Sequence, residues 1–304
     1  MEFKMLSKKE LIRYMPSFRK LYSKCFSGEI TDDEIYWRYI NNPLKDILVN
    51  VAIENGEIVA NYAVSPIKVN YKGNIINAGL SLNTMTDPDY RGKGLFVKLA
   101  EELYDHMKAC GYKLVVGFPH YTSNRGFQEK LGWKNIYEIP MMEYRLAEDI
   151  IEEEANVIEV NQIRCFEDIT KEKNINIVKD DKYIMWRYYE NPSVKYHAIE
   201  DGGGFIIYKI HQNKINIVEN KFVSRENMMS LVTKLIRHAK YIKKDTVTSW
   251  ATINSVEHLV LQKLGFKNNF PIIYFGGVSL NEEVEDDIYD YRDWIIKLGD
   301  DNIF

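Results

Sequence analysis

The sequence predicts an α/β protein in which two similar domains, each with a mixed sheet, follow one another along the chain. Three observations support this prediction. A strand, a glycine-rich turn, a helix and a second strand follow in order over residues 75–118. A motif of aromatic residues occurs once in each half. The 304 residues exceed the usual size of one domain, and 45% of them are hydrophobic, which suffices for two cores.

The composition excludes several classes of protein. Lys and Arg number 40 against 44 Asp and Glu, so the net charge is −4. A broad basic surface is therefore not expected, and neither nucleic acid nor an anionic membrane is expected as a partner. Cys25, Cys110 and Cys165 lie far apart without a C-x-x-C pair. This argues against a disulfide framework or a metal site and suits a reducing cytoplasm.

The sequence predicts neither export nor membrane insertion. The first ten residues hold two acidic side chains and no apolar core. The longest uncharged apolar-rich run near the end, 270–280, falls well short of the ~20 residues that span a bilayer. We therefore expect a cytoplasmic chain. Its oligomeric state stays open, a dimer included.

Two short motifs are repeated along the chain. These are W-R-Y-x-x-N-P at 37–43 and 186–192, and K-L-G-[W/F]-K-N at 130–135 and 263–268. Repeats this far apart indicate duplicated domains. An acidic stretch at 148–154 marks the join. The predicted domains are residues 1–148 and 149–304.

The first W-R-Y motif predicts a short helix. Thr31 and Glu34 have capping-box spacing before it, and Asn42 ends it because the residue before a proline avoids the α conformation. Trp37 and Tyr39 are expected to pack in the core. The alternative is that they line a pocket.

Residues 75–118 carry the strongest local signal. Residues 75–86 alternate between apolar and polar side chains, as a strand does, and a turn at 87–89 follows. Apolar residues then recur at helical spacing up to a stop at Gly111. Residues 114–118 are an unbroken apolar run, typical of a buried parallel strand. Together these segments predict a right-handed βαβ unit.

The turn inside this unit, R-G-K-G at 91–94, has the properties of an anion site. Gly92 and Gly94 have no Cβ, so a ligand can approach the backbone closely. The first amides of the following helix carry partial positive charge, and Arg91 and Lys93 add full charges. The spacing of a Walker A loop is absent. The sequence therefore predicts a diphosphate-sized ligand here.

The segment T-D-P-D-Y-R-G-K-G at 86–94 resembles motif A of the GNAT superfamily of N-acetyltransferases, whose loop reads Q/R-x-x-G-x-G/A. Residues 123–133, ending in L-G-W, are similar to a later segment of that family. The resemblance implies acetyl-CoA as cosubstrate. Its pyrophosphate would lie on the loop and its pantetheine along the preceding strand, from which the next strand diverges. The implied coenzyme-binding residues are Thr84, Met85, Thr86, Arg91, Gly92, Lys93, Gly94, Leu95, Phe96, Asn124 and Phe127, although Phe96 stands where the family usually has a small residue.

The second half departs from this pattern. After a strand-like segment at 215–219, residues 224–227 stand where the loop would be and include no glycine. Ser224 is a good helix N-cap, but Glu226 falls in the first helical turn, where a carboxylate takes the place of an anion. The expectation is a GNAT-like domain that kept the fold and lost the cofactor.

Acetyl transfer to an amine requires a base and then a proton donor for the leaving thiolate. The tyrosine that serves many family members as the acid corresponds here to Gln128. His120 and Tyr121, at the carboxyl end of the second strand, and Asn83 are candidate catalytic residues. The aromatic closing segment 291–304 predicts docking. It resembles tandem acetyltransferases of the enhanced intracellular survival family, which implies the Phe304 carboxylate as a further candidate base.

These observations predict an acyltransferase that moves an acetyl group from acetyl-CoA to a small-molecule acceptor, an amine, by direct attack. One alternative is a sugar N- or O-acetyltransferase of surface polysaccharide assembly. Another is a coenzyme-binding pseudoenzyme, suggested by Gln128. No metal is expected.

Overall fold

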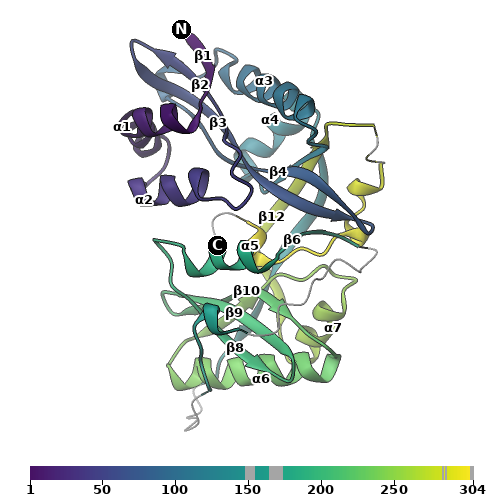
Figure 1. Ribbon diagram of the computed structural model, residues 1–304. Coiled ribbons are helices and arrows are strands. Elements are labelled where there is room, and N and C mark those ends of the chain that lie inside the picture. The colour runs from purple at the N-terminus through teal and green to yellow at the C-terminus, as the bar shows by residue number, and fades with distance from the viewer. Residues whose placement is uncertain (148–154, 164–173, 283, 285, 302–304) are drawn as a thin grey trace. The chain divides into compact units, whose positions relative to one another are not determined.

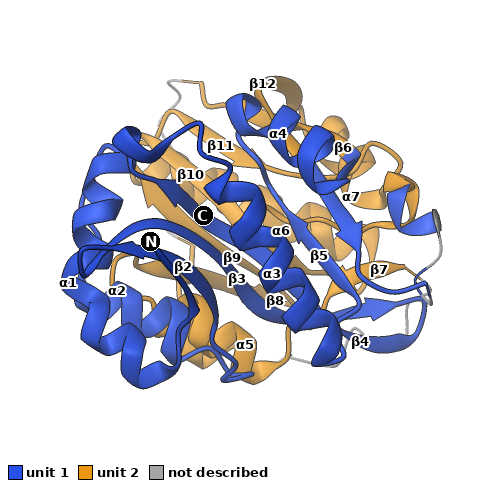
Figure 2. Cartoon of the chain, turned by 90° about the horizontal axis from the view of Figure 1, so that it is seen from above, with its two compact units in different colours: residues 1–136, 275–289 blue, residues 137–274, 290–304 orange. Residues whose placement is uncertain are grey.

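The computed structural model describes residues 1–147, 155–163, 174–282, 284 and 286–301 (Figure 1). The chain forms two compact units, and each takes one segment from the opposite half of the sequence (Figure 2). Unit 1 comprises Met1–Ile136 and Phe275–Tyr289, and unit 2 comprises Tyr137–Tyr274 and Asp290–Phe304. The join expected at 148–154 lies outside the described residues.

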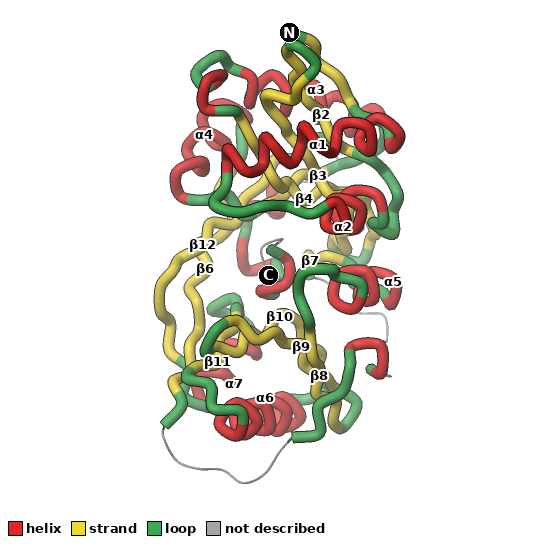
Figure 3. The backbone as a smooth tube through the Cα atoms, turned by 90° about the vertical axis from the view of Figure 1, so that its left-hand side faces the viewer, coloured by secondary structure: helices red, strands yellow, loops and turns green. Residues whose placement is uncertain are grey.

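Unit 1 contains a mixed sheet in the order β1-β2-β3-β4-β5-β12, in which β4 and β5 are parallel and the other neighbours antiparallel. Its strands are β1 (Glu2–Met5), β2 (Leu48–Glu54), β3 (Glu57–Tyr71), β4 (Asn74–Thr86), β5 (Leu114–Gly117) and the end of β12 (Lys267–Ser279). Its helices are α1 (Lys8–Cys25), α2 (Asp32–Ile35), α3 (Leu95–Ala109) and α4 (Tyr121–Leu131). The β3–β4 hairpin is its longest ladder, visible in the tube drawing (Figure 3).

Helices cover both faces of this sheet. On one face, α3 and α4 bury Leu99, Leu103 and Phe127 against the strands. On the other face, α1 and the segment after α2 bury a second cluster that includes Phe18 and Tyr39. The predicted strand, helix and parallel strand are confirmed as β4, α3 and β5.

Unit 2 repeats this arrangement with the order β6-β11-β10-β9-β8, in which β10 and β11 are parallel. Its strands are β6 (Lys134–Arg145, from Tyr137 onward), β7 (Ile175–Ile177), β8 (Tyr196–Asp201), β9 (Gly204–His211), β10 (Lys214–Lys221) and β11 (Thr246–Ser249). Its helices are α5 (Asp181–Ile184), α6 (Arg225–Tyr241) and α7 (Val256–Lys263). The cluster formed by α6 and α7 lies against the sheet. The predicted α/β class with mixed sheets is therefore confirmed.

The two sheets exchange their last strands, which the sequence did not predict. In unit 1, β5 pairs with the end of β12, a strand from the second half of the chain. In unit 2, β11 pairs with β6, a strand from the first half. Each sheet thus places a strand from the opposite half beside its shortest parallel strand.

The repeated aromatic motif forms the same structure twice. A short α-helix leads into one turn of π-helix, at Tyr36–Ile40 and again at Met185–Tyr189. The capping box between Thr31 and Glu34 is present as predicted. The motif's asparagine then accepts backbone hydrogen bonds, from Leu44 to Asn42 and from Ser193 and Val194 to Asn191. Because Trp37 and Tyr39 are buried, the motif's aromatic residues belong to the core.

Candidate active site

The glycine-rich turn lies between β4 and α3. A 3-10 turn over Pro88–Tyr90 follows β4, and Gly94 is the N-cap of α3. Gly92 has φ +76° and Gly94 has φ +73°, values that L side chains rarely adopt. No atom lies within 4 Å of the position that a Cβ would take at either residue. Glycine is therefore required by backbone conformation, and the surface beside it is open.

The turn is exposed and carries positive charge. Arg91 and Lys93 are exposed, as are both glycines. Arg91 Nε donates to the Thr86 carbonyl at 3.3 Å, and Lys93 Nζ lies 4.4 Å from the centre of the Tyr90 ring. The first N–H groups of α3 have no partner within the helix. Together with the helix dipole, they make this end of α3 suited to an anion.

Asp87, one of two carboxylates just before the turn, is paired. Asp87 Oδ2 lies 2.5 Å from Lys24 Nζ at the end of α1. The hydrogen bond from Lys24 holds the pKa of Asp87 below its usual value. Asp87 Oδ1 also accepts the Asp89 amide at 3.1 Å, which starts the 3-10 turn. The ion pair with Lys24 thus neutralises the charge of Asp87.

β4 extends beyond its ladder with β5. The parallel ladder joins Ala78, Gly79 and Leu80 to the apolar residues of β5, whereas β4 continues to Thr86. Residues 81–86 therefore run on toward the glycine turn past the last parallel pair. β5 itself ends at Gly117, so the β4 edge beyond it is not paired with β5. An extended ligand can use such a strand edge for hydrogen bonds.

A bulge shapes that extension of β4. Asn61 of β3 pairs with Met85, and the next pair on that strand joins Ala63 to Leu82, which leaves two β4 residues between them. One of these is Asn83, with φ +46°. Its carbonyl accepts from Asn61 Nδ2 at 2.8 Å, and its own Nδ2 donates to the Tyr39 hydroxyl at 2.9 Å. The Asn83 side chain is therefore fixed by Tyr39 of the first W-R-Y motif.

The other residues predicted for the coenzyme surround this extension. Thr84 and Thr86 are half-buried, whereas the Met85 and Leu95 side chains are buried in the two cores. Met85 and Leu95 therefore offer a ligand only backbone groups. Asn124 is buried on α4, one turn before Phe127.

His120 and Tyr121 begin α4 at the end of β5. His120 is the N-cap residue, and its Nδ1 lies 2.9 Å from Thr122 Oγ1. Tyr121 is 70% exposed, and its ring centre lies 4.2 Å from that of His120. The structure thus gives His120 a helix-capping role. The catalytic roles of His120 and Tyr121 stay predictions.

An aromatic group with buried hydroxyls lies between α3, α4 and the sheet, and sequence reasoning missed it. The Tyr62 hydroxyl lies 2.6 Å from that of Tyr104, Trp133 Nε1 donates to Tyr104 at 2.9 Å, and Ser81 Oγ donates to Tyr62 at 3.1 Å. Burial raises the pKa of Tyr62 to about 12, so its phenol stays protonated at neutral pH. Ser81 is the first β4 residue past the parallel ladder, so this hydroxyl chain ends at the start of the β4 extension.

Phe96 and Phe127 close the same aromatic group. Their ring centres lie 5.1 Å apart, and both rings contact Tyr62, with centres at 6.0 and 6.5 Å. Gln128, at the position of the family's usual acid, donates from Nε2 to Asn135 Oδ1 at 3.0 Å. An amide cannot replace a phenol as a proton donor, whereas the phenol of Tyr62 lies in the same aromatic group as Phe127.

Phe304 lies outside the described residues. Within the parts of the chain that the structure describes, no cluster of His, Cys, Asp or Glu could hold a metal ion. In those same parts, no helix is both long enough and apolar enough to cross a bilayer.

The corresponding turn of unit 2 has a different chemistry. Ser224 caps α6 by accepting the Asn227 amide at 3.1 Å, as predicted. Glu226 lies in the first turn of α6, and hydrogen bonds from its own backbone amide and from Ser224 lower its pKa. This helix end therefore already carries a carboxylate.

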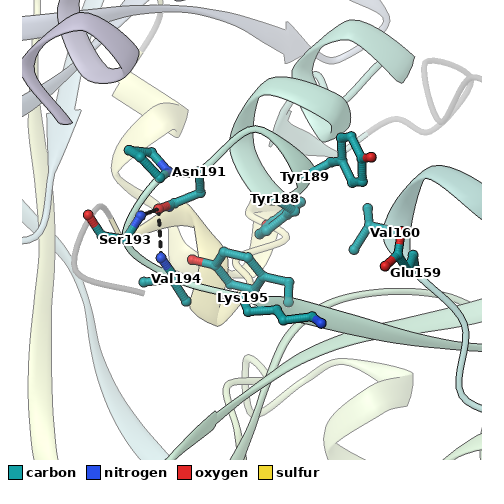
Figure 4. A pocket seen from close by; sticks show the side chains of 10 residues that line it. Glu159, Val160, Tyr188, Tyr189, Asn191, Ser193, Val194 and Lys195 are labelled. Atoms are coloured by element: carbon teal, nitrogen blue, oxygen red, sulfur yellow. Dashed lines mark hydrogen bonds between the residues drawn. The ribbon is translucent and has the colours of Figure 1, made fainter. Parts of the chain in front are cut away.

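A pocket of about 360 Å³ lies beside the second aromatic motif (Figure 4). Tyr188 and Tyr189 line it together with Asn191, Lys195 and Glu159. The two hydrogen bonds that Asn191 Oδ1 accepts shape its wall. In this copy a tyrosine of the motif thus contributes both to the core and to a pocket.

Comparison with known proteins assigns part of the chain to a known kind of domain. The profile described as "Acetyltransferase (GNAT) domain" matches residues 11–136, which include the glycine turn, the β4 extension and α4. Residues 11–136 are thus similar to a GNAT acetyltransferase domain. The comparison with curated proteins gives no match.

Solved structures share the fold of this chain. A GCN5-related N-acetyltransferase from Anabaena variabilis ATCC 29413 has a TM-score of 0.65 at 14% identity, over 92% of this chain and 73% of the other. One from Kribbella flavida has 0.68 at 12% identity, over 92% and 72%. An Enterococcus faecalis V583 protein of unknown function, described as a "Probable N-Acyltransferase", has 0.67 at 14%, over 92% and 72%. Each of these alignments covers 92% of this chain and therefore includes residues of both units.

Proposed function

We propose that this chain transfers an acetyl group from acetyl-CoA to a small-molecule acceptor, an amine, by direct attack. One observation carries the proposal. An exposed turn with two left-handed glycines and two cations opens α3, directly after a strand that extends beyond its parallel neighbour. The turn suits the pyrophosphate, and the strand edge at 84–86 suits the pantetheine amides. We place the reaction in the cytoplasm, as the composition suggests.

The reaction moves two protons. The amine nitrogen attacks the thioester carbonyl carbon, the carbon–sulfur bond breaks, the amine loses a proton and the thiolate gains one. A lysine-like amine has a pKa of about 10.4, so its neutral form costs about 4.6 kcal/mol at pH 7. A positioned base is therefore valuable, and His120, Tyr121 and the Phe304 carboxylate are the proposed candidates.

We assign the return of a proton to the hydroxyls of Ser81 and Tyr62. Ser81 lies at the start of the β4 extension, and Tyr62 stands behind it as a protonated phenol. During the transfer the Ser81 hydroxyl would give its proton to the thiolate and accept a hydrogen bond from the Tyr62 phenol, and the proton that the amine releases would then restore Ser81. This arrangement would substitute for the tyrosine that Gln128 replaces.

The test is coenzyme binding by calorimetry with two matched glycine variants. Gly94→Ala places a side chain at φ +73° beside the anion site, whereas Gly111→Ala does the same at φ +82°, just after the C-terminus of α3. Both variants carry similar backbone strain in open surroundings. We expect at least about tenfold weaker binding only for Gly94→Ala. Equal affinities in the two variants, or no binding by the wild type at millimolar coenzyme, would refute the site.

Gln128 favours one second candidate, a pseudoenzyme that binds the coenzyme without turnover. Thiol release measured across amines, amino sugars and sugar hydroxyls separates the possibilities. Release with amines supports the proposal, and release only with sugars supports the polysaccharide alternative. Coenzyme binding without thiol release in the presence of any of these acceptors supports the pseudoenzyme.

A further inference from the structure

The parallel strands of unit 2 have the same opening as those of unit 1. The β10–β11 ladder has three pairs, the last joining Asn216 to Thr248, and β10 then continues to Lys221. A bulge follows between Ile217 and Glu219, as it follows the last parallel pair of β4. Residues 217–221 therefore correspond to the β4 extension that we propose for the pantetheine.

The chain's own closing segment occupies this opening. Gly299 lies so close to β10 that a Cβ on it would stand 2.8 Å from the Val218 carbonyl oxygen and 2.2 Å from the Tyr188 hydroxyl. Lys297 Nζ donates to Asn220 Oδ1 at 2.7 Å. The segment thus contacts the β10 extension, the bulge within it and the second aromatic motif.

Buried ion pairs fix the segment there. Lys179 Nζ lies 2.5 Å from Glu219 Oε2 on β10 and 2.6 Å from Asp300 Oδ1. All three side chains are less than a tenth exposed. Lys179 therefore bridges the closing segment to the strand. Asp300 Oδ2 also accepts the Lys297 amide at 2.7 Å, which folds the segment into a turn.

Two further elements of unit 2, α7 and the second aromatic motif, contact the closing segment. Lys297 Nζ lies 2.7 Å from Glu257 Oε1 in the first turn of α7, the helix that corresponds to α4. Arg187, the buried arginine of the second W-R-Y motif, donates to the carbonyls of Gly299 at 3.3 Å and Asp301 at 2.8 Å. A strand edge, a helix start and the aromatic motif thus converge on one peptide.

Apolar contacts complete the docking. Trp294, Ile296 and Leu298 alternate along the segment and are at most 4% exposed. The Ile295 amide donates to the Ile175 carbonyl at 2.9 Å, beside a parallel bridge between Ile175 and Trp294. The segment therefore docks partly as an added strand, with side chains on one face buried.

We propose that residues 294–301 are a built-in peptide ligand of unit 2 and occupy the strand opening that in unit 1 takes the coenzyme. The part concerning the coenzyme rests on the proposed function. The peptide-binding site itself rests only on contacts within unit 2. The second W-R-Y motif, which the proposed function does not use, gains a role here, because its arginine holds the peptide's backbone.

Hydrogen–deuterium exchange on the full chain tests the docking. In the wild type, amides of 294–301 are expected to exchange as slowly as those of β10. Gly299→Ala and, as a milder second variant, Lys297→Ala should each speed exchange in 294–301 and in 217–221 by tenfold or more, with 81–86 unchanged. Arg292→Ala, two residues before the segment, is the control, because the exposed Arg292 side chain pairs with its neighbour Asp290. It should leave 294–301 protected.

Two outcomes overturn the inference. One is a wild-type segment 294–301 that exchanges like an unstructured peptide. The other is native mass spectrometry that finds two coenzyme molecules per wild-type chain, since the second opening would then be free. One molecule per chain is the expected count. No bound coenzyme would refute the proposed function and leave the exchange result to decide the peptide site.

Discussion

Trp133 Nε1 and the Tyr62 hydroxyl approach Tyr104 from two sides, at 2.9 and 2.6 Å from its oxygen. Three large side chains from β3, α3 and the segment after α4 are thereby joined by polar atoms inside an apolar core. Buried hydroxyls are costly without partners, so each member of this group depends on the others.

The first prediction concerns stability. Tyr62→Phe keeps the ring but removes the hydroxyl that Tyr104 and Ser81 contact, so we expect the free energy of unfolding to fall by about 1–3 kcal/mol. Urea denaturation measures it. The control is Tyr121→Phe, the same chemical change on a side chain that is 70% exposed. A loss of equal size in both variants would contradict the role of the buried group.

The second prediction concerns alkaline pH. Burial raises the pKa of Tyr62 to about 12, whereas the unfolded chain has a tyrosine pKa near 10. Between pH 10 and pH 12 the unfolded state therefore loses a proton that the folded state keeps, and stability falls as pH rises. In Tyr62→Phe, the pH dependence of the free energy of unfolding should correspond to the release of one proton fewer. An unchanged slope between pH 10 and 11.5 would show that Tyr62 ionises normally.

The third prediction tests the proton donor and rests on the proposed function. Ser81→Ala should lower kcat by about 10²-fold with little change in coenzyme affinity, because the leaving thiolate loses its nearest hydroxyl. Gln128→Ala should leave kcat unchanged, since that amide only contacts Asn135. Acceptor-dependent thiol release gives both values. If the glutamine variant is the impaired one, the assignment of the proton path is wrong.

The fourth prediction concerns the paired carboxylate beside the glycine turn. The hydrogen bond from Lys24 lowers the pKa of Asp87, so the pair's stabilisation is present above the ordinary pKa near 3.9 and is lost as pH falls below it. Lys24→Met should raise that pKa and weaken coenzyme binding, because it removes a cation and leaves the Asp87 carboxylate unpaired four residues before Arg91. The control is Lys20→Met on the same helix, α1, which breaks an exposed 3.6 Å contact with Glu57 of β3. Carboxyl NMR titration and calorimetry report the two effects.

The fifth prediction concerns the buried charges of unit 2. Burial opposes the charge on Lys179, but the Asp300 and Glu219 carboxylates outweigh it and raise the pKa. Lys179→Met would leave two buried carboxylates without their cation, so we expect a loss of about 3–5 kcal/mol. Lys214→Met, at an exposed 3.7 Å contact with Glu143, should cost less than about 1 kcal/mol. Chemical denaturation that ranks the two equally would contradict the bridging role.

Local signals predicted the region around the glycine turn well. Alternation over 75–86, the glycines at 92 and 94 and the apolar run at 114–118 each depend on neighbours in sequence, and each is found where expected. The repeated W-R-Y motif also marked two equivalent structures, although its π-helical turn has no signal in composition.

The pairing of strands that are distant in the sequence has no such local signal. Nothing in the pattern of β12 indicates that its last residues pair with β5, because an apolar strand fits any open edge of a sheet. The group of Tyr62, Tyr104 and Trp133 was missed for the same reason. Its members lie on separate elements, and each reads alone as an ordinary core aromatic. A tyrosine within the buried run of β3 was the one available hint.

The crossing of β6 and β12 between the units has a consequence for biosynthesis. When the ribosome has made the first half of the chain, β5 still lacks the neighbour that covers its outer side, and that neighbour is among the last segments to be translated. The nascent protein must therefore carry an unprotected strand border through most of its synthesis. An amino-terminal half expressed alone should aggregate, because this border of β5 then stays uncovered.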